Sequence, residues 1–142
     1  MMEFASRVAE RLRELFQAAL DESQSFAELS GAYDELEREA GETLKGDALL
    51  PVRRAIAGNR LTIALVCKQP VRTCQPLFER VLAMGFEDAE DKLLQVGAYC
   101  RYCVRTGDAS VAKRHLSDAL QEARKVFEPK ILEPYEDLLK KI

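Results

Sequence analysis

Arg101 and Arg105 are the residues whose type and spacing best suit a binding reaction. They stand one turn apart in a segment with helical periodicity. The planar guanidinium group of arginine donates two parallel hydrogen bonds to a carboxylate or a phosphate. A groove built around this pair would hold an acidic peptide or the C-terminal carboxylate of a partner. The alternative is that these arginines pair with acidic residues of the same chain.

The cysteines form a weaker pattern. Cys67, Cys74, Cys100 and Cys103 are spaced as C-x6-C and C-x2-C. Zinc sites that use such pairs usually hold them on tight turns, whereas YCRYC lies within a predicted helix. We therefore expect the four thiols to pack as small apolar side chains and to hold no metal.

The remaining side chains indicate no catalytic centre. His115 is the single histidine, so one chain cannot build a site from several imidazoles, and we expect it at the edge of the core. The sequence contains no Gly-rich phosphate loop, no Gly-x-Ser-x-Gly and no Glu-x-x-His pair. We expect a non-catalytic protein without a cofactor.

The charge is divided unevenly along the chain. The 142 residues carry a formal net charge of −3, with −7 on residues 1–50 and +4 on residues 51–142. Within residues 51–80, six Lys and Arg residues are accompanied by Glu79 alone. This division indicates either attraction between packed helices or chains, or a basic face for an anionic partner. A pI near 5.3 argues against nucleic acid as the partner.

Composition and the first residues bear on location. The hydrophobic share of 47% and the charged share of 32% are typical of one folded, soluble domain. No apolar run approaches the roughly 20 residues that span a membrane. Charges interrupt MMEFASRVAERLRELF, unlike a signal peptide, and its acidic residues are unlike a transit peptide. We expect a cytoplasmic protein with reduced cysteines.

Apolar spacing predicts helices along the whole chain. The expected segments are 3–20, 24–44, 48–68, 71–84, 88–105, 109–127 and a short helix within 128–142. The 26–40 stripe is narrow, as at a helix–helix seam. Segment 48–68 is apolar on nearly all sides, which predicts a central helix, although 61–67 also allows a strand. The expected N-caps are Ser23 or Ser25, Asp47 and Asp108. Segment 88–105 is expected to start at Asp88, and Gly85 is expected to close the 71–84 helix.

These elements predict an all-α fold of about seven helices in a single domain, 1–142. Residues 1–46 form an acidic helical hairpin, residues 47–127 two repeat-like hairpins, and residues 128–142 a closing helix. The antiparallel hairpins stack as a short solenoid or as an irregular helical bundle.

The two middle hairpins show an internal repeat. Cys74, Phe78 and Val81 recur 38 residues later as Ala112, Leu116 and Ala119. This small-large-small spacing lets two helices approach closely and fills the space toward the next hairpin. The pattern resembles the tetratricopeptide repeat, best over residues 93–126, with Cys100 at the small position of the first helix and Gly107-Asp108 at the turn. It departs from the family in having Cys103 in place of the usual Tyr, no closing Pro and a longer period.

In that family the first helices line a concave groove. The resemblance therefore implies that Gly97, Arg101 and Arg105 face such a groove. Subtracting 38 gives Asn59, Ile63 and Cys67 one repeat earlier, and Arg53 and Arg60 are expected to flank the same surface.

We expect an adaptor module that binds a protein or an acidic peptide, and neither nucleic acid nor a membrane. The expected binding residues are Arg101, Arg105, Asn59, Arg60, Arg53, Gly97 and Ile63. Two alternatives remain open. One is a structural or assembly subunit that forms homo-oligomers through the 26–40 stripe and its opposite charges. The other is a small helical enzyme or a ligand-binding bundle.

Overall fold

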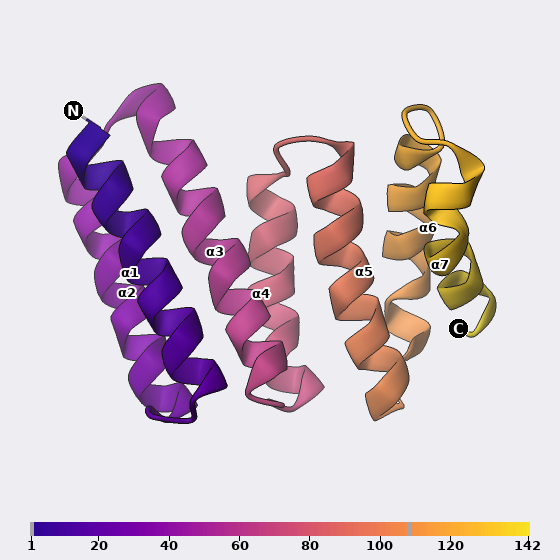
Figure 1. Ribbon diagram of the computed structural model, residues 1–142, viewed down its shortest axis with the longest axis horizontal. Helices are drawn as coiled ribbons and strands as arrows, with labels where there is room; N and C mark the ends of the chain where they lie inside the picture. Colours follow the sequence, from indigo (N-terminus) through magenta and orange to yellow (C-terminus); the bar gives the residue numbers. More distant parts are fainter. Residues whose placement is uncertain (1, 108) are drawn as a thin grey trace. The chain divides into compact units, whose positions relative to one another are not determined.

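The apolar periodicity of the sequence is realised as helices from end to end. The computed structural model describes residues 2–107 and 109–142, and within them it has seven α-helices and no strand (Figure 1). The helices are α1 Met2–Leu20, α2 Phe26–Thr43, α3 Leu49–Val66, α4 Val71–Met84, α5 Ala89–Thr106, α6 Lys113–Ala123 and α7 Pro129–Lys140. The all-α prediction is confirmed. The alternative of a strand at 61–67 is wrong, because residues 61–66 continue α3.

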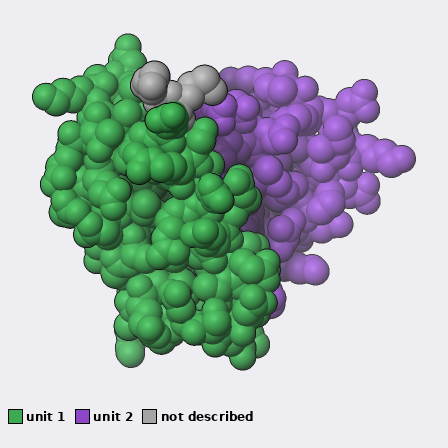
Figure 2. Space-filling view, turned by 60° about the vertical axis from the view of Figure 1, so that its left-hand side comes forward, with its two compact units in different colours: residues 1–85 green, residues 86–142 purple. Residues whose placement is uncertain are grey.

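The chain divides into two compact units, residues 1–85 and residues 86–142 (Figure 2). Unit 1 holds α1 to α4, and unit 2 holds α5 to α7. The boundary falls directly after Gly85, between the two hairpins that the sequence pattern relates.

α3 is the centre of unit 1 and packs against α1, α2 and α4. A helix surrounded on several sides needs apolar residues around most of its circumference, which explains its composition. The narrow stripe of α2 faces this core: Leu29, Tyr33, Leu36 and Ala40 are all buried. The stripe is therefore used inside unit 1, which argues against the alternative in which these residues mediate self-association.

Local signals mark four of the helix ends. Ser25 caps α2 through a capping box, in which its hydroxyl accepts the backbone N–H of Glu28 and the Glu28 carboxylate accepts that of Ser25. The Asp88 side chain caps α5. Gly85 and Gly107 close α4 and α5 with positive φ angles, a conformation that glycine adopts without strain.

Two expected boundaries differ from the structure, and Asp108 lies outside the described residues. Asp47 lies in a short 3₁₀ turn, Gly46–Ala48, so the N-cap of α3 is Ala48 without a side-chain bond. The expected helix 109–127 is shorter: a 3₁₀ turn, Ala109–Val111, precedes α6. α6 ends early because the N–H groups of Lys125 and Val126 bond three residues back and tighten the last turn.

In unit 2, α6 packs against both α5 and α7. Ion pairs join each of these helix pairs. Lys92 of α5 lies 2.6 Å from Glu122 of α6. Arg124, at the end of α6, donates two hydrogen bonds of 2.9 Å to the carboxylate of Glu136 on α7. This forked pair fixes how α7 returns along α6.

The six residues of the expected repeat are alike in burial. Cys74, Phe78, Val81, Ala112, Leu116 and Ala119 are all buried. The first helices α3, α5 and α7 begin at residues 49, 89 and 129, which is an offset of 40, whereas the second helices α4 and α6 begin at residues 71 and 113, which is an offset of 42. The link after α5, which includes the 3₁₀ turn Ala109–Val111, is longer than the link after α3. The resemblance to the tetratricopeptide repeat itself stays a prediction.

Candidate functional site

A shallow groove of about 320 Å³ lies between α5 and α7 in unit 2. It is lined by Arg101, Val104, Arg105, Pro134, Asp137, Leu138 and Lys141. Three of these residues are cations and one is an acid, so the groove carries an excess of positive charge. Buried Leu138 and half-buried Val104 supply its apolar part. Such a combination suits a segment that carries both carboxylates and apolar groups. We call it the α5–α7 groove.

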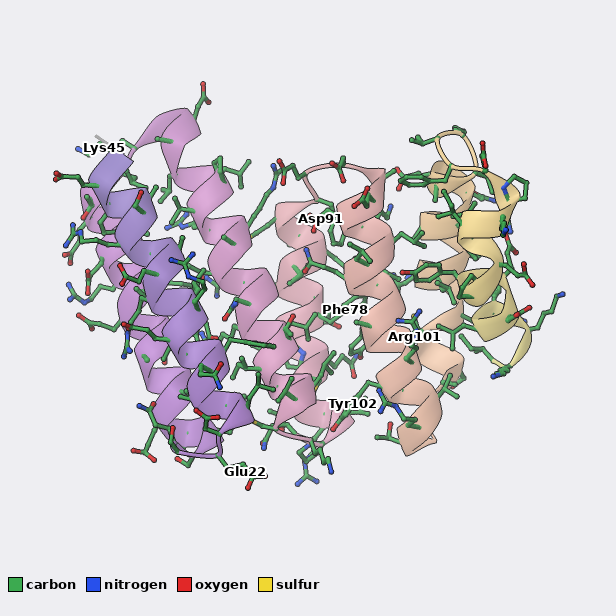
Figure 3. The ribbon with its side chains drawn as sticks, viewed as in Figure 1. Glu22, Lys45, Phe78, Asp91, Arg101 and Tyr102 are labelled. Atoms are coloured by element: carbon green, nitrogen blue, oxygen red, sulfur yellow. The ribbon has the colours of Figure 1, made fainter. Side chains whose placement is uncertain are left out.

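Tyr135 brings α7 against α5 directly above this groove. Its ring lies over Gly97, where a Cβ atom would approach the ring Cε1 to 2.5 Å. The guanidinium carbon of Arg101 lies 5.0 Å from the centre of the same ring, a cation–π arrangement. Figure 3 shows Arg101 and the buried Tyr102 leaving α5 on different sides. The Tyr135 ring thus supports the exposed Arg101 side chain from one side.

The expectation that Gly97 faces an open groove is wrong. Gly97 is buried, and the Tyr135 ring occupies the space in front of it. A residue without a Cβ is needed there because the ring passes so close to the backbone. Gly97 therefore positions α7 and does not meet a ligand.

Arg105 and Lys141 provide the exposed charge of the α5–α7 groove. Both side chains are exposed, and the ion pairs among the described residues include neither of them. Asp137 is the single acid among the residues that line the groove. Arg105 and Lys141, which form no ion pair with another described residue, lie close to Arg101, which is stacked on a ring. Such a group of cations favours an anionic ligand.

The arginines of α3 have a different role from those of α5. Arg60 is only 13% exposed and lies 2.8 Å from Asp34 and 2.8 Å from the Ser30 hydroxyl, both on α2. Arg80 of α4 pairs with Glu37 of α2 at 2.5 Å. Both contacts join the basic segment to the acidic hairpin. For Arg60 the structure thus favours pairing within the chain over partner binding.

Asn59 also connects α3 to α2. Its Oδ1 accepts a hydrogen bond from the hydroxyl of Tyr33, whose side chain is fully buried. Burial raises the pKa of the Tyr33 phenol, so the hydroxyl stays protonated and keeps donating to Asn59. One side of the Asn59 amide is therefore committed to the packing of unit 1.

Asn59 does border a second groove, between α1 and α3 in unit 1. This groove has a volume of about 470 Å³ and is lined by Arg13, Phe16, Gln17, Asn59 and Thr62. Arg13 is its one cation. Gln17 donates to Asp21 and Thr62 to the carbonyl of Gly58, so both already use a donor. The charge that attracts an anion is weaker here than in the α5–α7 groove.

Ile63 is excluded from a binding surface by its burial, whereas the expected role of Arg53 stays a prediction. Ile63 is fully buried in the core of unit 1, so its expected place in a groove is wrong. The expectation for Ile63 comes from subtracting 38 from the number of Arg101. The first helices begin 40 residues apart, so the counterpart of Arg101 on α3 is Leu61. Arg53 is exposed on α3.

The structure therefore separates the seven expected binding residues. Arg53, Asn59, Arg60 and Ile63 belong to unit 1, whereas Gly97, Arg101 and Arg105 belong to unit 2. Of these residues, Arg101 and Arg105 line one groove together.

The sequence interpretation missed the contribution of α7. Tyr135, Leu138 and Lys141 complete the α5–α7 groove, although residues 128–142 were expected only to close the fold. The missing signal was the 40-residue spacing of the first helices. This spacing makes α7 the counterpart of α5, and Lys141 the counterpart of Arg101. Consecutive first helices of a repeat pack beside each other, so the spacing predicts that α7 lies next to α5.

The cysteines behave as core residues. Cys74, Cys100 and Cys103 are buried and Cys67 is half-buried, and all four carry thiols. Burial raises the pKa of Cys100 to about 12, and burial also raises the pKa of Cys67, so neither is an activated nucleophile. The described residues contain no group of three or more His, Cys, Asp or Glu side chains that could hold a metal ion.

Comparison of the chain with protein-family models, with curated proteins and with solved structures found no match. Among the helices of the described residues, none combines the length and the apolar character that a membrane span requires.

Proposed function

We propose that this protein is a non-catalytic binding module that holds an acidic segment of a partner protein in the α5–α7 groove. The observation that carries the proposal is the grouping of Arg101, Arg105 and Lys141 around the apolar Leu138. The module acts as a cytoplasmic adaptor built from tetratricopeptide-like hairpins, and it needs no cofactor.

Each groove residue has a distinct task in this proposal. Arg101, stacked on Tyr135, presents its guanidinium group at little cost in side-chain entropy. Arg105 and Lys141 approach the ligand from the two helices and favour carboxylates over cationic side chains. Leu138 and Val104 exclude water from part of the contact, which strengthens each charged hydrogen bond.

The proposal predicts that charge reversal in the groove abolishes binding of an acidic peptide. The change is Arg105→Glu together with Lys141→Glu, because both side chains are exposed and neither takes part in an ion pair of the described residues. The probe is a fluorescently labelled, glutamate-rich peptide, and binding is followed by anisotropy at low and physiological salt. We expect at least about a hundredfold loss of affinity, as for losing two charged contacts.

Arg114→Glu is the matched control, since Arg114 is an exposed cation on α6 outside the groove. Circular dichroism must show the same helix content in all variants. Equal peptide binding by the double variant and by Arg114→Glu would reject the α5–α7 groove as the binding site.

A further inference from the structure

An exposed apolar pair lies next to the α5–α7 groove. Leu94 of α5 is 54% exposed and Ile131 of α7 is 56% exposed. Leu94 precedes Gly97 by about one turn, and Ile131 precedes Tyr135 by about one turn. Because Gly97 and Tyr135 touch, Leu94 and Ile131 lie at the same level of the two helices.

α5 and α7 run in the same direction (Figure 1). The contacts agree: Gly97 meets Tyr135, and the later residues of both helices meet in the groove. The α5–α7 face therefore has an apolar end, formed by Leu94 and Ile131, and a basic end, formed by the groove. Leu94 and Arg101 are seven residues apart, which is about 10 Å along a helix.

We propose that the ligand of this face is an amphipathic acidic helix, whose carboxylates meet Arg101 and Arg105 and whose apolar side chain covers Leu94 and Ile131. This inference rests on the proposed function and adds the form of the partner segment. Two carboxylates one turn apart on a helix match the spacing of Arg101 and Arg105. An extended segment would turn every second side chain away from the face.

The helix dipoles fix the direction of the bound helix. The groove lies at the C-terminal ends of α5 and α7, where the partial charge of both helices is negative. A bound helix that runs antiparallel to them places its positive N-terminus there, and acidic residues are most favourable in the first turn of a helix. The expected order in the ligand is therefore a glutamate, a second glutamate four residues later, and a leucine seven residues after that.

The test compares two labelled helical peptides of about 18 residues, long enough to form a helix in alanine-rich sequence. One carries the glutamates and the leucine in the expected order, and the other carries them in reverse order. The protein variants are Leu94→Gln with Ile131→Gln, and the exposed Val126→Gln is the control for loss of an apolar side chain outside this face. Binding is measured by anisotropy with the full chain.

We expect the first peptide to bind at least about fivefold more tightly than the reversed one, and to lose about fivefold to tenfold on the Leu94→Gln, Ile131→Gln variant. Val126→Gln should bind it like the unaltered protein. If both peptides bind equally and the apolar variant changes nothing while Arg105→Glu with Lys141→Glu abolishes binding, this inference is wrong and the proposed function stands. If the charge variant also binds normally, both are wrong.

Discussion

Gly97 is the residue on which the shape of unit 2 depends most directly. The Tyr135 ring contacts its backbone side and also supports the Arg101 guanidinium group. One position without a side chain therefore brings α7 to α5 and orients a groove cation. The sequence pattern singles out Gly97 as a groove residue. The structure shows that a glycine is needed there because of Tyr135, which stands 38 residues later in the chain.

We predict that Gly97→Ala destabilises the protein. The new methyl group would lie 2.5 Å from Tyr135 Cε1, and we expect a loss of about 1–2 kcal/mol in the free energy of unfolding. In a Tyr135→Ala background the same change should instead stabilise by up to about 1 kcal/mol, because alanine is the better helix former. Urea unfolding of the four proteins measures both effects.

Gly31→Ala serves as the control for helix propensity alone. Gly31 is exposed on α2, and nothing lies within 4 Å of a Cβ atom added there. We expect it to stabilise in either background. If Gly97→Ala has the same sign with and without the Tyr135 ring, the ring does not determine the identity of residue 97.

At the scale of the elements, sequence periodicity predicts most of the fold. All seven segments with apolar spacing contain helices, and Ser25, Gly85 and Asp88 mark ends that the structure confirms. These signals involve residues that are close in the sequence, so they specify the same helices and helix ends whatever the tertiary arrangement is. The groove could not be predicted in the same way, because it depends on α5 meeting α7, two helices that are separated in the chain by α6.

We predict that Ser25→Ala weakens the start of α2 by about 1 kcal/mol in the free energy of unfolding, the usual value of an N-cap hydroxyl. The hydrogen bonds with Ser25, that to its backbone N–H first, lower the pKa of Glu28. A carboxyl group whose pKa is lowered by folding stabilises the protein fully at pH values above the ordinary glutamate pKa. That stabilisation is lost as the pH falls through the lowered pKa. Ser25→Ala keeps the backbone N–H and removes the side-chain contact, so the part of the stability difference that comes through the Glu28 carboxylate should be lost in acid.

Urea unfolding of both proteins at neutral pH and at about pH 3, below the ordinary range of glutamate, measures this dependence. Ser23→Ala is the control, since Ser23 stands before α2 and donates its hydroxyl to the carbonyl of Ala18. A difference for Ser25→Ala that is the same at both pH values would show that the Ser25 hydroxyl does not support the carboxylate of Glu28.

At the scale of the whole molecule, the acidic residues 1–50 and the basic residues 51–142 do not correspond to the two compact units. Residues 1–85 carry a formal charge of −2 and residues 86–142 carry −1, so neither unit is basic. The acidic hairpin and the basic segment 51–80 fall in the same unit and meet through Arg60–Asp34 and Arg80–Glu37. The basic surface that the proposed function uses is therefore local, at the α5–α7 groove.

We predict that the pair of Arg80 and Glu37 contributes about 0.5–1 kcal/mol to the stability of unit 1, as expected for a partly exposed ion pair. Arg80→Glu and Glu37→Lys should each destabilise the protein, because each places like charges together. The double variant restores opposite charges and should recover most of the loss. Urea unfolding of all four proteins gives the coupling energy, which should decrease at 1 M salt through screening.

The Arg124–Glu136 pair of unit 2 provides the matching control, because its two side chains are likewise partly exposed. Exchange of those charges should leave the Arg80–Glu37 coupling energy unchanged. Strictly additive effects of Arg80→Glu and Glu37→Lys would mean that the two charges do not interact. Of the two ion pairs that join the acidic hairpin to the basic segment in the described residues, Arg60–Asp34 alone would then contribute an attraction.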